Sequence, residues 1–278
     1  MKYFIKEEIR KNRLEAYDEN DNLVGEALMS PFMSSEIFDK PRLNIYINIS
    51  VNKIEDKIEV KDSLLHELII RGNNVAKKEK EKNENLEVKF YHCCFADDKE
   101  NIQYYSSKDG FQQDEGMYIF KLPIEEDEKN LTPIEGIEFV DLVLDDEKVI
   151  KELIKKQGEI FTSGYTMVDL NRMKQEDRYF CISAKHNGKL VGNVVVIIKE
   201  SEDNNVYGWI DDLFVSKEYR RLGIGKYLLL AAINKMRCLQ IKESMLEVWS
   251  SNEKAMAMYQ SVGYEFYKET EVAIGMFL

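Results

Sequence analysis

A glycine-containing turn joins a strand-like segment to a helix-like segment in the C-terminal half of the chain. Residues 209–215 (Trp-Ile-Asp-Asp-Leu-Phe-Val) are typical of a strand, and residues 227–239 are typical of a helix. Between them, residues 220–226 read Arg-Arg-Leu-Gly-Ile-Gly-Lys. A helix that begins at such a turn leaves its first backbone N–H groups without acceptors, and glycines let a bulky anion approach them. The pattern predicts a phosphate site, although Gly-x-Gly also occurs in turns that only connect a strand to a helix.

Three cations gather at this turn in a chain that is acidic overall. Arg220, Arg221 and Lys226 lie within it, whereas the formal net charge of the chain is -12. The turn is not a P-loop, because the pattern Gly-x-x-x-x-Gly-Lys-Ser/Thr is missing. It is not a dinucleotide fingerprint either, because Gly225 is followed by Lys, Tyr and Leu and no third glycine appears.

A second motif follows the predicted helix. Residues 244–249 alternate as a strand does, and Asn252 is a good N-cap for a helix over residues 253–262. Gly263 is a natural residue to end that helix. A strand, a phosphate turn and a helix are thus followed by a strand, a second turn and a second helix.

The two motifs together resemble the GNAT superfamily of acyl-CoA-dependent N-acyltransferases. The glycine motif of the family, Arg/Gln-x-x-Gly-x-Gly/Ala, is matched at residues 220–225. The later signature is Asn-x-x-Ala, a Tyr four residues on, and then Gly-Phe/Tyr. It is matched by Asn252, Ala255, Tyr259, Gly263 and Tyr264.

The resemblance implies acetyl-CoA (coenzyme A) as a cosubstrate and no metal. In the family, the strand before the turn parts from the next strand, often at a bulge, and pantetheine pairs with the freed edge. A backbone N–H there, that of Val215, is the candidate for stabilising the oxyanion. Carried over residue by residue, the cofactor-binding set is Leu213, Phe214, Val215, Arg220, Arg221, Leu222, Gly223, Ile224, Gly225, Lys226, Asn252 and Tyr259.

Tyr259, Asp211 and Asp212 are the candidate catalytic residues. Tyr259 is the candidate general acid, because a phenol is protonated at neutral pH and can donate to a departing thiolate. It could instead only pack on the cofactor, and Asn252 could only cap its helix. Asp211 or Asp212 could take the proton of the amine or hold a cationic substrate, or each could be a strand residue without a role. By strand parity Asp211 shares a face with Leu213, and Asp212 with Phe214, unless a bulge shifts the count.

The surrounding elements agree with the fold that the resemblance implies. This fold is α/β (α+β), with a mixed, mostly antiparallel central sheet flanked by helices. The resemblance covers roughly residues 136–278, where a catalytic domain is expected. The expected elements there are strands at 136–143, 178–185 and 189–199, helices at 145–161 and 168–174, and two closing strands at 264–267 and 272–278.

The N-terminal half repeats this order and predicts a second, smaller, degenerate GNAT-like domain over residues 1–122. Its phosphate turn is missing, because residues 52–59 contain three acids and no glycine. The counterparts of the first two helices are expected to be absent or shortened around residues 31–41. This domain is expected to serve in packing, in dimerisation or as a wall of a substrate groove. The expected elements are strands at 13–18, 23–29, 43–51 and 86–95, helices at 60–75 and 97–109, and a closing strand from 118.

Length and composition fit this organisation. A chain of 278 residues suits two domains, and the Pro- and acid-rich residues 123–135 are expected to be a linker. The four cysteines show no paired framework, so they are expected to be reduced and buried in a cytoplasmic protein. No apolar run approaches the length of a membrane span, so no membrane association is expected. No basic stripe with interleaved aromatics indicates nucleic-acid binding.

The function implied by the resemblance is N-acetyltransferase activity. An acetyl group would move from acetyl-CoA to a primary amine of a small molecule or peptide, by direct attack in a ternary complex. The acidity of the chain weakly favours a basic acceptor. The alternative is a non-catalytic acyl-CoA-binding sensor or interaction module. A monomer or a homodimer is expected.

Overall fold

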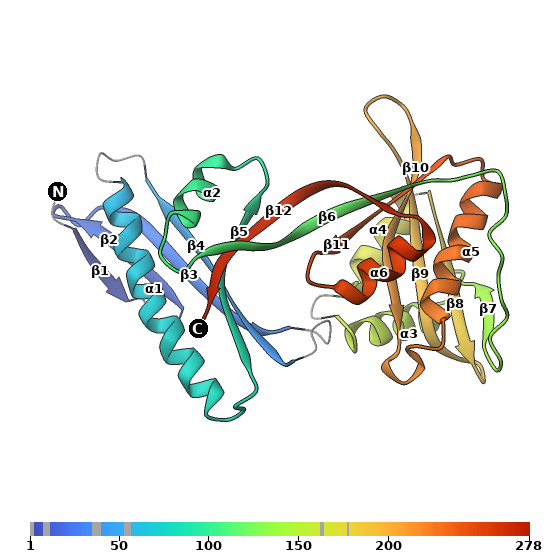
Figure 1. Ribbon diagram of the computed structural model, residues 1–278, viewed down its shortest axis with the longest axis horizontal. Helices are drawn as coiled ribbons and strands as arrows, with labels where there is room; N and C mark the ends of the chain where they lie inside the picture. The colour runs from blue at the N-terminus through green and yellow to red at the C-terminus, as the bar shows by residue number, and fades with distance from the viewer. Residues whose placement is uncertain (1–2, 8–11, 35–39, 53–56, 162–163, 177) are drawn as a thin grey trace. The chain divides into compact units, whose positions relative to one another are not determined.

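The chain divides into two compact units. The computed structural model describes residues 3–7, 12–34, 40–52, 57–161, 164–176 and 178–278 (Figure 1). The first unit comprises Met1–Gly116 and Glu269–Leu278, and the second comprises Met117–Lys268. These limits differ from the expected domain boundaries, because the end of the chain returns to the first unit and the expected linker lies in the second. No helix in the described ranges is long and apolar enough to cross a membrane.

The second unit is a mixed, mostly antiparallel sheet with helices on both faces (Figure 1). Its strand order is β7-β8-β9-β10-β11-β6, and only the β10–β11 pair is parallel. The sequence predicts these elements to within a few residues. Their bounds are β7 (Glu138–Asp141), α3 (Glu147–Gly158), α4 (Met167–Glu176), β8 (Arg178–His186), β9 (Lys189–Glu200), β10 (Val206–Val215), the 3₁₀ turn Lys217–Tyr219, α5 (Ile224–Cys238), β11 (Glu243–Trp249) and α6 (Glu253–Val262).

Two apolar cores cover opposite faces of this sheet. Under α5 and α6, Leu228 and Leu229 pack against Val194, Val196 and other residues of the central strands. Under α3 and α4, a second cluster is formed by residues such as Leu153 and Leu170. Because β9 is buried on both faces, its sequence is a continuous apolar run, as is typical of a central strand. The end of β10 is therefore held between two packed layers.

The first unit repeats the element order of the second. A strand hairpin, a strand, a helix, a parallel strand and a short helix follow one another in both, which confirms a tandem arrangement. One core contains Leu64, Leu68 and Phe90 and joins its helices to one face of the sheet. The bounds are β1 (Tyr3–Glu7), β2 (Arg13–Asp18), β3 (Leu23–Met33), β4 (Arg42–Val51), α1 (Lys57–Lys80), β5 (Glu87–Phe95) and α2 (Lys99–Ser106).

Two long strands serve both units. β6 (Gln112–Pro123) begins in the first unit and pairs with β11 in the second. β12 (Glu265–Phe277) begins in the second unit and pairs with β5 in the first. The expectation of two closing strands at 264–267 and 272–278 is therefore wrong. The residues between them, Lys-Glu-Thr-Glu, contain no glycine or proline to form a turn, so the strand continues.

Among its described residues, the first unit has no counterpart of the two helices that lie between β7 and β8 of the second unit. The expected place for this loss, residues 31–41, is wrong, because β1 and β2 are the counterparts of β7 and β8 and only residues 8–12 separate them. The sequence analysis did not identify β1, a strand of five residues. Residues 53–56 of the glycine-free turn lie outside the described residues, and the first turn of α1 carries Glu59.

The segment expected to be a linker is bound along α5. Asn234 accepts a hydrogen bond from the backbone N–H of Lys129 and donates one to its carbonyl, both at 2.8 Å. Arg237 donates to the carbonyl of Glu126. The four cysteines are free thiols, but Cys238 is exposed rather than buried as expected.

Candidate functional site

Strand β10 carries a β-bulge at Asp211. Its pairing with β9 passes from Ile210↔Val196 to Asp212↔Val195, so no residue of β9 lies opposite Asp211. The extra residue moves Asp212 to the opposite face from Ile210. This overturns the simple parity expectation for Asp211: it bonds to Tyr165 on the α3–α4 side, whereas Leu213 packs against the core under α5.

Strands β10 and β11 part at the same place. They pair only through residues 208–210 and 244–246, although β10 continues to Val215 and β11 to Trp249. Beyond residue 210 the edge of β10 that faces β11 is therefore unpaired by that strand. An extended ligand could form backbone hydrogen bonds with such an edge.

The backbone N–H of Val215 points to this open edge. The N–H of Ser216 donates to the carbonyl of Val191 in β9 at 2.8 Å. Successive N–H groups of a strand point to opposite sides, so the N–H of Val215 faces away from β9. The side chain of Phe214, by contrast, is buried in the core under α3 and α4, and only its backbone could contact a ligand.

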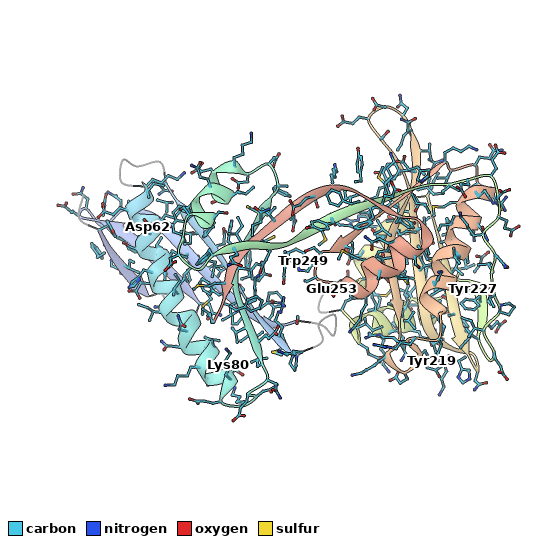
Figure 2. The ribbon with its side chains drawn as sticks, in the orientation of Figure 1. Asp62, Lys80, Tyr219, Tyr227, Trp249 and Glu253 are labelled. Atoms are coloured by element: carbon cyan, nitrogen blue, oxygen red, sulfur yellow. The ribbon has the colours of Figure 1, made fainter. Side chains whose placement is uncertain are left out.

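The turn after β10 ends with free N–H groups at the start of α5. Gly223 is the N-cap, with φ of 85°, and the first intrahelical bond runs from the N–H of Tyr227 to its carbonyl at 2.9 Å. Helix geometry leaves the N–H groups of Gly223, Ile224, Gly225 and Lys226 without helical acceptors. Tyr219 and Tyr227, labelled in Figure 2, mark the two ends of this turn. The side chain of Ile224 is buried and anchors the turn to the core.

The side chains of the turn divide into two groups. Arg220 folds back, and its Nε donates to the carbonyl of Val215 at 3.1 Å, which ties the turn to the end of β10. Arg221 and Lys226 are exposed, and neither forms an ion pair within the described part of the chain. Leu222 is also exposed, whereas a Cβ on Gly225 would lie 3.3 Å from the sulfur of Met258. The turn thus presents N–H groups and positive charge to solvent.

The second motif has the local structure that its residues predict. The side chain of Asn252 caps α6 by accepting from the N–H of Ala255, and Gly263 ends the helix with φ of 108°. The ring of Tyr259 is buried against that of Tyr264, whose hydroxyl is hydrogen-bonded to Ser244 at 2.6 Å. Burial, and then the charge of Asp212, raise the pKa of Tyr259, so its hydroxyl is protonated at neutral pH.

Asp212 is a buried carboxylate with an unusual pKa. Burial is the largest cause and raises its pKa to about 7, and the neighbouring charge of Asp211 adds to this. Hydrogen bonds from the Gln157 side chain and the Leu213 N–H act in the opposite direction. Its Oδ2 is buried and has no hydrogen-bond partner among the described residues. A carboxylate that titrates near neutral pH is suited to proton transfer.

Gln157 and Tyr165 were missed by the sequence analysis. The hydroxyl of Tyr165 donates to Oδ2 of Asp211, and the side chain of Gln157 accepts from the backbone N–H of Tyr165. Gln157 lies one and two turns after Leu153 and Ile150 on the buried stripe of α3. A polar residue at a core position of a helical stripe was the available signal. For Tyr165 the sequence offered none.

Comparison with known proteins assigns the second unit. Residues 148–264 match the acetyltransferase (GNAT) family. The chain carries a GNAT acetyltransferase domain. This domain is that of an acyltransferase, and its sheet and flanking helices match the fold expected from the sequence.

Three relatives illustrate the similarity. A probable spermine N(1)-acetyltransferase of Bacillus subtilis subsp. natto is 28% identical over 131 residues, which are 46% of this chain and 86% of that protein. The N-alpha-acetyltransferase 30 of Dictyostelium discoideum is 27% identical over 146 residues, 52% of this chain and 73% of that protein. A tandem GNAT protein from the clavulanic acid biosynthesis pathway superposes with a TM-score of 0.50 at 14% identity, covering 94% of this chain and 81% of its own. The last likeness is one of fold.

The raised pKa of Asp212 predicts a loss of stability with rising pH. The unfolded chain releases this proton near pH 3.8 and the folded chain near pH 7, so the folded state is favoured below pH 3.8 and the advantage is lost as the pH rises through 7. A difference of about three pKa units corresponds to about 4 kcal/mol. We expect Asp212→Asn to remove this part of the pH dependence.

Urea unfolding at pH 4.5 and pH 8 measures this effect. The fluorescence of Trp209 and Trp249 reports on the second unit, since the chain has two tryptophans and both lie there. The free energy of unfolding of wild type should fall more between the two pH values than that of Asp212→Asn. Equal falls would show that Asp212 titrates normally.

Proposed function

We propose that the chain transfers an acetyl group from acetyl-CoA to a primary amine. The observation that carries the proposal is the buried, unpartnered Oδ2 of Asp212, on the strand that opens at Asp211 and leads into the turn at Gly223. The turn fits a diphosphate, because free N–H groups, the positive end of α5 and the cations Arg221 and Lys226 coincide there. The open edge of β10 fits the extended pantetheine arm.

The residues would act in sequence on a bound amine and thioester. Acetyl-CoA supplies the activated carbonyl. Asp212 takes a proton from the ammonium form of the acceptor, directly or through water, and so provides the neutral amine. The N–H of Val215 stabilises the tetrahedral oxyanion, a contribution of about 2.7–4 kcal/mol for such donors. As the tetrahedral intermediate collapses, Tyr259 donates its proton to the departing thiolate, and the resulting phenolate takes the proton that the amide nitrogen releases, so Tyr259 is restored.

The acceptor is proposed to be a cationic amine. Asp211 is exposed beside buried Asp212, so a substrate that reaches the base meets a second carboxylate first. The net charge of -12 favours cations over anions at long range. The relatives named for spermine and for N-terminal acetylation act on amines of this class, and either a polyamine or a peptide amine would satisfy the site. The role of the first unit stays a prediction. A homodimer and a cytoplasmic location stay predictions.

Turnover of acetyl-CoA with a panel of polyamines, aminosugars and peptides tests the proposal. We expect kcat/KM for the preferred amine to rise with pH through about 7, because Asp212 must be ionised to accept a proton. In Asp212→Asn this rise of kcat/KM through pH 7 should disappear, and only the pH dependence that comes from titration of the amine should be left. Coenzyme A binding without turnover of any amine would contradict acetyl transfer and favour the sensor alternative.

A further inference from the structure

The first unit has a pair of parted strands of its own. Its parallel pair, β4 and β5, is the counterpart of β10 and β11 in the second unit. β4 and β5 pair only through residues 42–46 and 87–91, although β4 continues to Val51 and β5 to Phe95. Beyond the last paired residues, the facing edges of the two strands do not continue the backbone hydrogen bonds of the sheet. This opening is filled differently from the one beside β10.

A histidine side chain joins the two parted strands. His92 is the first residue of β5 beyond the paired stretch, and Ile47 is the first residue of β4 beyond it. Nδ1 of His92 lies 3.0 Å from the carbonyl oxygen of Ile47. Because a carbonyl only accepts hydrogen bonds, Nδ1 carries a proton and donates it to this bond. The side chain thus replaces a backbone hydrogen bond between the strands.

The rest of the imidazole ring is enclosed in the core. His92 is only 3% exposed, and its ring stacks on that of Tyr105 in α2 with the centroids 4.2 Å apart. On the other side of β5, Ile274 of β12 is the paired residue. Nε2 of His92 is buried and has no hydrogen-bond partner among the described residues. With the proton on Nδ1, Nε2 of the neutral ring is an acceptor, and a second proton would create a buried N–H without a partner there.

Two charged groups act on this ring. Lys61 of α1 is buried, donates to Oδ1 of Asn101 at 2.7 Å, and opposes a second cation at His92. Asp98, the N-cap of α2, favours that cation, but its carboxylate already accepts from the side chain and the backbone of Asn101. Burial is the largest cause and lowers the pKa of His92 below its ordinary value of 6.5, against the effect of the bond to Ile47. The ring is therefore neutral at pH 7.

The other titratable groups around the ring keep their charge state between pH 5 and pH 7. Burial raises the pKa of Tyr46 in β4, Tyr105 in α2 and Cys94 in β5, so these groups stay neutral. Burial lowers the pKa of Lys61 to about 8, so it stays charged in this range. Hydrogen bonds from Asn101 lower the pKa of Asp98, which stays ionised. Among these groups, His92 alone changes its charge as the solution becomes acidic.

We propose that the hydrogen bond from His92 to Ile47 is a pH-sensitive contact that holds β4, β5 and α2 together at neutral pH and is lost in acid. A protonated ring would bury a charge and an unpaired N–H, and it regains hydration only by leaving the core. The opened chain takes up this proton near pH 6.5 and the closed chain only at lower pH. The stability of the closed form is therefore complete above pH 6.5 and is lost as the pH falls through the lowered pKa. The proposal concerns the first unit and does not depend on acetyl transfer.

Amide hydrogen exchange of β4, β5 and α2 between pH 7 and pH 5 tests the proposal in the full chain. The protection factor, which is corrected for the intrinsic exchange rate at each pH, reports the free energy of local opening. In wild type it should fall by up to about tenfold for each pH unit below 6.5, the limit for uptake of a single proton. Protection of β9 in the second unit should not fall. Constant protection of β4, β5 and α2 would overturn the proposal.

Two substitutions separate the titration of His92 from its packing. His92→Asn keeps a donor near the position of Nδ1, and His92→Phe keeps a ring that can stack on Tyr105, but neither side chain titrates in this range. Both variants should be less protected than wild type at pH 7, because one leaves a cavity and the other leaves the carbonyl of Ile47 without its donor. Their protection should then stay nearly level down to pH 5.

The matched control is His66→Asn, which changes an exposed histidine of α1. This variant should keep the fall in protection seen in wild type. A fall of the same size in the folded His92 variants would assign the pH dependence to another group and overturn the proposal.

Nitrogen-15 NMR of the His92 ring tests the geometry directly. We expect a neutral ring at pH 7 with its proton on Nδ1, and a titration below pH 6.5. A proton on Nε2 of the neutral ring would contradict the hydrogen bond to Ile47. A ring that titrates at or above pH 6.5 would contradict the loss of this contact in acid.

Discussion

Gly223→Glu is expected to weaken the binding of coenzyme A on the order of 100- to 1,000-fold. The new carboxylate would stand at the N-cap of α5, among the free N–H groups proposed to hold the diphosphate. Two like charges 4 Å apart near a protein surface repel by about 4 kcal/mol, and each 1.4 kcal/mol is about tenfold in affinity. The added side chain would also cover part of the backbone. Isothermal titration of the variant and wild type with coenzyme A measures the change.

The control for this variant must share its backbone strain. Gly223 has φ of 85°, which an L-residue adopts only at a cost, so Gly223→Glu is destabilised regardless of any ligand. Gly110, with φ of 77°, lies in the first unit after α2, and Gly110→Glu adds the same charge under similar strain. Its affinity for coenzyme A should stay near that of wild type. Equal affinities of both variants and wild type would rule out the turn as the phosphate site.

Tyr259→Phe is expected to lower kcat by about 10²- to 10⁴-fold, the usual contribution of a general acid. Its phenol is buried, its pKa is raised by burial, and so it holds a proton at every pH where the enzyme would operate. The thiolate of coenzyme A would then leave without protonation. Affinity for coenzyme A should change by less than about threefold, because the substitution keeps the ring and its packing. Steady-state kinetics and calorimetry measure the two quantities separately.

Tyr264→Phe is the matched control for Tyr259→Phe. Tyr264 is a buried tyrosine beside Tyr259, and its hydroxyl is used in a hydrogen bond to Ser244. Its loss should cost about 1 kcal/mol of stability and leave kcat nearly unchanged. Similar kcat values for both variants would indicate that Tyr259 only packs in this core.

The backbone requirements of the site were predictable from the sequence. Gly223 and Gly263 adopt left-handed conformations that few other residues tolerate, and Asn252 caps the helix that its position predicts. These features depend only on neighbouring residues, so a short stretch of sequence is enough to predict them. The repeat of strands and helices in the two halves was predictable for a similar reason, since each element carries its own periodicity.

Features that depend on distant contacts were not predictable. The bulge at Asp211 is a shift in the pairing of β10 with β9. No residue in the sequence of β10 alone indicates such a shift. The hydrogen bonds of Gln157 and Tyr165 join residues that α3, the loop before α4 and β10 bring together. β12 was predicted as two strands, whereas it is a single strand whose C-terminal part pairs with the distant strand β5. β1 was missed because it is only five residues long, and its pairing with the distant strand β2 is not visible in so short a segment.

A crystal structure of the wild-type chain grown with coenzyme A tests the central claim most directly. We expect the diphosphate against the N–H groups of residues 223–226 and the pantetheine arm along the open edge of β10, with its sulfur near Val215 and Tyr259. Coenzyme A bound in the first unit, or density that leaves the turn at Gly223 empty, would contradict it.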